Sequence, residues 1–270
     1  MLGDIGQLYA QRELLSDFAW RDLRARYKGS LFGFAWNFLN PLLQLLVYYV
    51  LFGVILGLKP VSALGTEPAY GYAVFLFTGL LPWTFFSGAL QGGAAAVLSN
   101  AGLVKKVRLP LQILPAATVL SNLVNFLLAL VVLAVVVLAS GVPPQPTLAF
   151  VPLLLAIEVL LALGFAYALA AVAVFFRDVI HILGIGLTLW YFLTPVIFSL
   201  QSIAEKHPTE YFLLHLNPMT PLITGYQRVI LDGVAPDWPW LVYSAAVAAA
   251  VFLVGFALYG RLSDAFEEAL

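Results

Sequence analysis

The sequence contains no cysteine among its 270 residues, and only 10% of them are charged. The absence of cysteine excludes disulfide bonds, thiolate metal sites and cysteine nucleophiles. A soluble domain usually carries about 25% charged residues, whereas this chain is 62% hydrophobic. Its net charge of −1 also excludes the strongly basic surface of a general nucleic-acid-binding protein. We therefore expect an integral membrane protein that has no nucleic-acid partner.

Motifs for catalysis and nucleotide binding are also missing. Neither GxxxxGKS nor GxxxxGKT occurs, so the chain has no P-loop of its own. The three histidines, at 181, 207 and 215, lack the spacing of metal ligands. Ser87 precedes a glycine, but Phe85 stands where an intramembrane serine protease motif requires glycine. We expect no catalytic residue, no metal site and no cofactor in this chain.

Long hydrophobic runs are what the sequence has in abundance. A helix needs about 20 mostly apolar residues to cross the hydrocarbon core of a membrane. The runs are continuous and rich in Leu and Ala, unlike the alternating pattern of barrel strands. The predicted fold class is therefore all-α integral membrane with six transmembrane helices. These are Phe34–Leu58, Gly71–Leu98, Ala116–Ser140, Phe150–Phe176, Val179–Leu200 and Trp238–Tyr259.

The distribution of Lys and Arg predicts the orientation, because cytoplasmic loops hold the excess of these residues. Ten of the 13 fall on one side of the predicted spans, together with both ends of the chain. The first thirty residues are charged and lack the apolar core of a signal peptide, so we expect no cleaved leader. Both termini are predicted to be cytoplasmic. The ten are Arg12, Arg21, Arg24, Arg26, Lys28, Lys105, Lys106, Arg108, Arg177 and Arg261; the other three are Lys59, Lys206 and Arg228.

Residues 11–28 are predicted to form an amphipathic helix along the membrane surface. We place it in an N-terminal cytoplasmic region, residues 1–33, ahead of a membrane domain at 34–270. The helix could anchor the chain or serve as a docking surface for a partner, and the sequence leaves both open. The charged face contains Glu13, Asp17, Arg21, Arg24 and Lys28, and the apolar face contains Leu15, Ala19, Trp20, Leu23 and Tyr27.

The connection between the last two predicted spans contains a second amphipathic helix. Thr220 is its predicted N-cap, Pro221 occupies the first helical position, and Gly233 is predicted to end it. On the outer face of the membrane this helix could be a lid over a passage or an interfacial packing element. Leu222, Ile223, Tyr226, Val229 and Ile230 line its apolar side.

Glu158 is the one carboxylate well inside a predicted span. A charged side chain there costs roughly 2.5–3.5 kcal/mol on insertion scales. We expect Glu158 to face the bundle interior or a water-filled path, to be protonated, or to bond Asn122 or Asn125 of the preceding span. A proton relay would need several such groups, so proton-coupled transport is not indicated.

Aromatic residues make up 14% of the chain, and many fall within the predicted spans. Rings near the span ends are explained by interfacial belts, whereas deeper hydroxyls need a polar partner or water. Aromatic faces also stack on the C–H faces of sugars, which suits a passage for a glycan. The candidate passage-lining residues are Tyr48, Tyr49, Phe52, Phe85, Phe86, Glu158, Trp190 and Tyr191.

Four sequence blocks follow one another in order over nearly the whole chain. They are DFAWRDLRARYKGSLFGFAWNFLNPLL from Asp17, NAGLVKKVRLPLQILP from Asn100, FRDVIHIL to LTPVIF between Phe176 and Phe198, and NPMTPLITGYQRVILDG from Asn217. Together they resemble the ABC-2 type permeases that export polysaccharides such as O-antigen and teichoic acid.

This resemblance implies an assembly rather than a lone chain. It implies a homodimer of six-span subunits in the bacterial inner membrane, paired with two copies of a separate ATP-binding subunit. That subunit, and not this chain, would bind ATP and Mg²⁺. The implied cargo is a glycan carried on a polyprenyl diphosphate lipid. Membrane lipids are the other implied partners.

The resemblance also implies roles for particular residues. Cytoplasmic coupling to the ATP-binding subunit would use the helix at 11–28 and the segment Asn100–Leu109. The alternative for the basic residues is contact with anionic lipid headgroups, worth about 1 kcal/mol each. The implied coupling residues are Arg21, Arg24, Lys28, Lys105, Lys106, Arg108, Arg177 and Asp178, and the implied extracytoplasmic gate contains Asn217, Pro218, Pro221, Tyr226 and Arg228.

Three alternatives remain at this point. A related ABC-2 permease for a drug or a simple lipid would share the architecture but have a smaller, less aromatic cavity. A membrane-embedded glycan or lipid transferase would require a cluster of His, Asp or Glu near one interface, and the sequence has none. A purely structural scaffold would need neither the lid-like helix nor Glu158.

Overall fold

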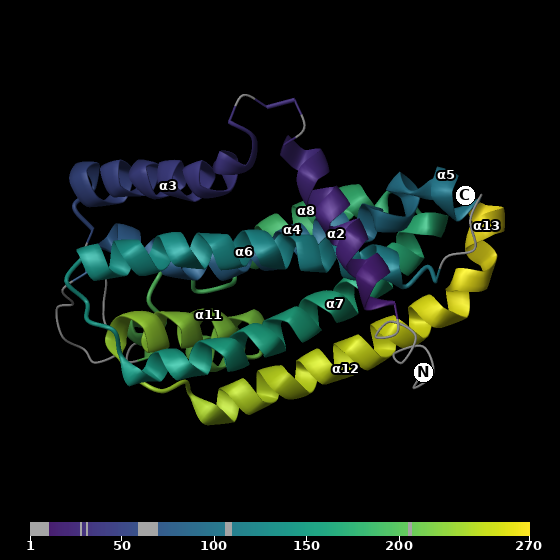
Figure 1. Ribbon diagram of the computed structural model, residues 1–270. Coiled ribbons are helices and arrows are strands. Elements are labelled where there is room, and N and C mark those ends of the chain that lie inside the picture. Colours follow the sequence, from purple (N-terminus) through teal and green to yellow (C-terminus); the bar gives the residue numbers. More distant parts are fainter. Residues whose placement is uncertain (1–10, 28, 31, 59–69, 106–109, 205–206) are drawn as a thin grey trace.

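The computed structural model describes every residue except 1–10, 28, 31, 59–69, 106–109 and 205–206. This described part is helical and contains no strand, as predicted. Figure 1 shows long helices lying side by side, with the N-terminal helix α2 crossing them. Five segments are long and apolar enough to cross a membrane, which makes this a multi-pass membrane protein. They are Trp36–Ile55, Tyr72–Ser99, Ile113–Ala139, Pro146–Phe175 and Trp238–Ala265.

The elements follow the chain in a simple order. α2 (Arg12–Tyr27) is followed by η1 (Gly33–Ala35) and by α3 (Trp36–Tyr48), which continues as the π-helical η2 (Tyr49–Ile55). The bundle contains α4 (Tyr72–Ser99), α6 (Ile113–Ala139), α7 (Val151–Phe175), α8 (Val179–Phe192) and α12 (Trp238–Leu262). Shorter elements connect them: α5 (Ala101–Val104), η3 (Pro146–Phe150), α9 (Gln201–Ala204), α10 (Pro208–His215), α11 (Met219–Gln227), η4 (Arg228–Asp232), η5 (Ser263–Ala265) and α13 (Phe266–Ala269).

The fifth predicted span, Val179–Leu200, is too long. The helix in this region, α8, has 14 residues and ends at Phe192. At 1.5 Å per residue it is about 21 Å long, shorter than the roughly 30 Å of hydrocarbon. Pro195 explains the early end, since proline lacks an N–H and disfavours helical geometry at the residue before it.

α4 is the central helix of the bundle. Twenty of its 28 residues are buried, and it packs against α6, α7, α8 and α11. A helix that is apolar on all sides is expected at the core of a bundle. The middle of α4 contains Ala89, Gly93 and Ala94, whose small size allows neighbouring helices to approach closely.

α7 and α12 make an especially close contact. Gly164 of α7 faces Gly255 of α12, and a Cβ atom on Gly164 would lie 2.5 Å from the backbone nitrogen of Phe252. Real atoms do not approach so closely, so this packing requires glycine at the contact. A local sequence pattern does not reveal this pair, because its two members lie on different helices.

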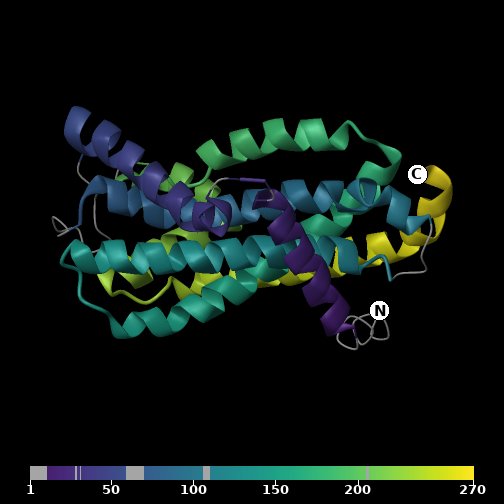
Figure 2. The same ribbon diagram turned by 45° about the horizontal axis from the view of Figure 1, so that its top comes forward.

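α2 packs across α6 (Figure 2). Ala19 and Leu23 of its predicted apolar face are buried, while Trp20 is 48% exposed. Asp22 accepts a hydrogen bond from Ser121 of α6. The predicted helix is therefore confirmed, and Ala19 and Leu23 of its apolar face are buried, whereas Trp20 is not. Its place along the membrane surface stays a prediction. In Figures 1 and 2, α2, α5 and α13 lie toward the same end of the bundle.

Substituting each of two glycines of α12 distinguishes the effect of close packing on stability from the effect of helix propensity. Gly255→Ala is expected to destabilise the protein by about 1–3 kcal/mol, because overpacked helices must move apart. Gly260→Ala is the matched control, since no atom lies within 4 Å of its added Cβ. Thermal unfolding in detergent measures both. Equal midpoints for the two variants would contradict the packing described here.

Candidate functional site

The segment between α8 and α12, residues 193–237, folds back into the bundle; we call it the connector. Its helix α11 contacts α4, α7 and α12. Eight of the nine residues of α11 are buried. Ile223 and Gln227 lie against Gly79 of α4, and Gly225 lies against Leu154 of α7. The predicted helix is therefore present and largely buried by protein, and its place on the outer face of the membrane stays a prediction.

The ends of α11 differ in how well the sequence predicted them. Gly233 ends the helical segment in the left-handed conformation (φ 65°), as predicted. Thr220 is not the N-cap: the helix begins at Met219, and the Oγ1 atom of Thr220 is buried with no hydrogen-bond partner in the described part of the chain. Asn217 caps the helix instead, with its Oδ1 atom accepting from the Met219 N–H at 3.0 Å.

Asn217 also joins the connector to α8. Its Oδ1 atom accepts a hydrogen bond from Trp190 Nε1 at 2.8 Å, and its Nδ2 atom donates to Thr194 Oγ1 at 2.8 Å. A candidate passage residue and a candidate gate residue thus lie in direct contact. One side chain fixes the start of α11 relative to the end of α8.

The remaining gate candidates lie along the same segment. Pro221 and Tyr226 are buried in α11. The carbonyl oxygen of Pro218 accepts a hydrogen bond from Ser244 of α12 at 2.8 Å. Arg228 begins η4, and its Nε atom donates to the Ala235 carbonyl at 3.1 Å. All five therefore belong to one compact unit.

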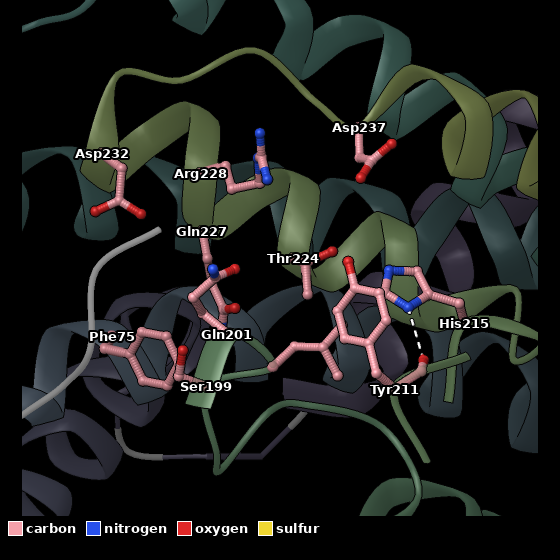
Figure 3. Close-up of a pocket in the computed structure, with 11 residues that line it drawn as sticks. Phe75, Ser199, Gln201, Tyr211, His215, Thr224, Gln227, Arg228, Asp232 and Asp237 are labelled. Atoms are coloured by element: carbon pink, nitrogen blue, oxygen red, sulfur yellow. Dashed lines mark hydrogen bonds between the residues drawn. The ribbon is translucent and has the colours of Figure 1, made fainter. Parts of the chain in front are cut away.

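A cavity of about 50 Å³ lies beside this unit (Figure 3). Arg228, Asp232 and Asp237 are among the residues that line it. In Figure 3, Thr224 and Gln227 point from α11 toward the opposite wall. Small-molecule sites usually measure about 300–1,000 Å³, so this cavity has room for a few water molecules and not for a sugar chain.

His215 and Tyr211 form the α10 side of this cavity. The His215 Nδ1 atom lies 2.9 Å from the Tyr211 carbonyl oxygen. The His215 ring lies 4.5 Å from the Trp240 ring as part of an aromatic cluster.

Glu158 of α7 is fully buried and bonds to α11. Tyr226, rather than the predicted Asn122 or Asn125, donates its hydroxyl to Glu158 Oε2 at 2.9 Å. The other carboxyl oxygen of Glu158 is buried and makes no hydrogen bond within the described residues. Tyr226 was predicted as an apolar residue of the gate helix, so the sequence named both partners without pairing them.

The aromatic candidates divide into two groups. Trp190 of α8 packs on Phe86 of α4 at 5.2 Å between ring centroids, and Tyr191 packs on Trp83 at 5.6 Å. Phe85 stacks on Phe126 of α6 at 5.3 Å. Phe85 and Phe86 are buried.

The second aromatic group lies on α3 and η2. Tyr48 contacts Phe52 at 6.0 Å between ring centroids, and Phe52 contacts Tyr72 at 5.4 Å. Tyr49 is 57% exposed. The lining of a passage by either group remains a prediction.

The coupling candidates lie toward the opposite end of the bundle from the connector. Arg21 of α2 donates to Asn100 Oδ1 at 2.8 Å, which joins α2 to the end of α4. Arg24, Lys105, Arg177 and Asp178 are exposed. Lys28, Lys106 and Arg108 lie outside the described residues. No group of three His, Cys, Asp or Glu that could hold a metal ion occurs in the described part of the chain.

Removing the Tyr226 hydroxyl tests the buried pair. Tyr226→Phe leaves the Glu158 carboxyl without its donor and is expected to cost about 1–3 kcal/mol. The double variant Glu158→Leu with Tyr226→Phe is expected to lose less stability, because neither polar group of the pair is left buried without its partner. Tyr243→Phe removes a hydroxyl that donates to the Leu216 carbonyl at the protein surface, where water can replace the bond, and serves as control. Thermal unfolding in lipid nanodiscs measures all three; a Tyr226→Phe midpoint equal to that of the control would rule out the pairing.

Comparison with known proteins gives a consistent result. The ABC-2 type transporter family matches residues 14–231. The chain is 37% identical, over the whole of both sequences, to the O-antigen export system permease protein RfbA of Myxococcus xanthus. It is 25% identical over 268 residues to the protein of the same name from Klebsiella pneumoniae, covering 99% of this chain and 97% of the relative. It is also 24% identical over 247 residues to the polysialic acid transport protein KpsM of Escherichia coli, covering 91% and 92%. The resemblance seen in the four sequence blocks is confirmed, and the chain belongs to the ABC-2 type transporter family.

Proposed function

We propose that this chain is the permease subunit of an ABC exporter for an O-antigen-type polysaccharide. The observation that carries the proposal is the 37% identity, with complete coverage of both chains, to a protein named for O-antigen export. A more distant relative is named for polysialic acid transport, which supports the same class of cargo. The cargo we propose is the glycan attached to a polyprenyl diphosphate lipid.

We propose six membrane crossings, with α8 and the connector together forming the fifth. α8 alone is shorter than the hydrocarbon core, and the re-entry of the connector beside it provides the remaining protein at that depth. Irregular backbone inside a membrane is tolerated where protein buries it, as here. The excess of Lys and Arg supports cytoplasmic termini in a bacterial inner membrane.

The chain is proposed to work with a second copy of itself and with two ATP-binding subunits that hold ATP and Mg²⁺. The lack of a P-loop means that the driving energy must come from another polypeptide. α3 has an exposed apolar face, which supports packing against a second copy. Leu42, Leu43, Leu46 and Val47 of this face are between 43% and 59% exposed.

The proposed mechanism transmits motion along α4. The corner formed by Arg21 and Asn100 lies at one end of this helix, and Gly79 near its other end lies against α11. A helix of 28 residues spans about 42 Å, so it can carry a displacement from the ATP-binding subunits to the connector. The connector then opens or closes by changing its contacts with α7 and α8.

Deleting the gene tests the function directly. Surface polysaccharide is expected to disappear, and lipid-linked polymer is expected to accumulate inside the cell. The purified permease should also retain a nucleotide-binding subunit. Unchanged surface polysaccharide in the deletion strain would contradict the proposed cargo.

The coupling role of the basic segment is testable by charge reversal. Lys105→Glu with Lys106→Glu is expected to reduce export at least tenfold, because the acidic side chains repel the complementary surface of the ATP-binding subunit. Surface glycan and co-purified ATP-binding subunit are the measurements.

The matched control is Lys59→Glu with Lys206→Glu, which makes the same change of charge on the predicted outer side. Both double variants are expected to insert in the membrane at wild-type amounts. Normal export by the Lys105 and Lys106 variant would refute the coupling role.

A further inference from the structure

A groove of about 310 Å³ lies between α3, α4 and α6, roughly half way along α4 and α6. Its volume falls within the usual range of small-molecule sites, about 300–1,000 Å³. We call it the amide groove, because side-chain amides supply most of its polar groups. These polar residues are Asn37, Asn40 and Gln44 of α3, Thr84 of α4, and Asn122 and Asn125 of α6.

The spacing of these amides brings them to one place. Asn40 and Gln44 lie three and seven residues after Asn37, so the three side chains share one face of α3. Asn122 and Asn125 are three residues apart on α6. Amides are uncommon in apolar membrane helices, where each needs a polar partner. Their convergence on one groove points to a binding surface.

Contacts within the protein leave polar capacity in the groove. Gln44 Nε2 donates to Tyr48 OH at 3.1 Å, one turn along its own helix. Asn125 Oδ1 is buried and accepts no hydrogen bond from the described residues. A buried amide oxygen of this kind requires an N–H or O–H donor to offset its desolvation. A ligand hydroxyl provides such a donor once the Asn125 side chain, which lines the groove, turns this oxygen toward it.

The described residues that line the groove are uncharged, since none of them is Lys, Arg, His, Asp or Glu. A diphosphate is bound best by cationic groups, and these residues supply none. Trp36, Phe85 and Phe126 supply aromatic surface beside the amides. Amides that both donate and accept, together with ring faces, match an uncharged sugar, which has hydroxyl groups around its edge and C–H groups on its faces.

The packing of α4 against α6 maintains this arrangement. A Cβ atom on Gly88 would lie 3.0 Å from Asn122 Oδ1, so glycine leaves room for the amide. Ser121, next to Asn122, donates a hydrogen bond to Asp22 of α2. Ser121 therefore connects the groove to α2. This helix also carries Arg21, at the corner where we propose that motion enters from the ATP-binding subunit.

We infer that the amide groove binds an uncharged sugar unit of the exported glycan, with Asn125 as an anchor for a sugar hydroxyl. The inference rests on the proposed function, since it assumes a glycan as cargo. It assigns the recognition of sugar to the side of α3 that faces α4 and α6 within one subunit.

Photo-crosslinking tests occupancy in the assembled exporter. The probe is p-benzoylphenylalanine in place of Trp36, which lines the groove, or in place of Trp238, a 46% exposed tryptophan at the start of α12 that does not. In irradiated cells that make the lipid-linked polysaccharide of the host, the purified permease is expected to carry glycan with the Trp36 probe. The Trp238 probe is expected to capture none.

Substitutions of Asn125 test the anchor. Asn125→Leu keeps the volume and removes the amide, so crosslinking and surface glycan are expected to fall about tenfold. Asn125→Gln keeps an amide and is expected to retain most of both. The amount of permease in the membrane and its co-purification with the ATP-binding subunit should not change. Gln44→Met provides a second test at a half-buried position should Asn125→Leu fail to assemble.

The outcomes separate the inference from the proposed function. Loss of surface glycan in the deletion strain, combined with normal export by Asn125→Leu and Gln44→Met, would overturn the sugar site and leave the exporter intact. Glycan capture by both tryptophan probes alike would also overturn it. Surface glycan that persists in the deletion strain would contradict both the proposed function and the sugar site.

Discussion

Polar side chains inside this bundle need protein partners, because a hydrocarbon surrounding offers them no water. The placement of the connector depends on this constraint. Asn217 accepts hydrogen bonds from the indole of Trp190 and the first N–H of α11, and Tyr226 donates to one carboxyl oxygen of Glu158. These bonds tie the connector to α8 and α7. Apolar packing alone would allow α11 to slide along α4, whereas these directional bonds define one position.

The same constraint gives the bundle two chemically distinct regions. One lies at the connector, where Asn217 and Arg228 bond to protein groups and the cavity of about 50 Å³ holds only a few waters. The other is the amide groove, of about 310 Å³, on which five side-chain amides converge. Both regions contain a buried oxygen with no partner among the described residues, Thr220 Oγ1 in the first and Asn125 Oδ1 in the second. The difference in volume is therefore the reason for assigning a structural role to the first region and recognition to the second.

Local sequence patterns predicted much of the fold. Continuous apolar runs located five segments long enough to cross the membrane, and alternating charge located α2. Gly233 predicted the end of η4, because its left-handed conformation strongly favours glycine. The length predicted for α8 was wrong because a hydropathy profile depends on composition alone. Residues 193–200 are mostly apolar, so the profile continued through them, although Pro195 prevents a helix there.

The sites were less predictable than the fold. Sequence named both Glu158 and Tyr226, but the partners that it offered for the glutamate were Asn122 and Asn125, because nothing local links two residues 68 positions apart. The burial of α11 was not predictable either, because an amphipathic pattern cannot show how much protein covers its polar side. The spacing of Asn37, Asn40 and Gln44 was visible in the sequence. Only the structure shows that two amides of α6, Asn122 and Asn125, line the same groove.

The glycine contact between α7 and α12 has a consequence for how the subunit can move. With backbones this close, neither helix can rotate or shift by a turn without collision, so the two must travel as one rigid body. In the proposed transport cycle, rearrangement then falls to the elements outside this pair, among them the connector, α3 and α8. The pair of α7 and α12 would serve as a fixed support against which the connector moves.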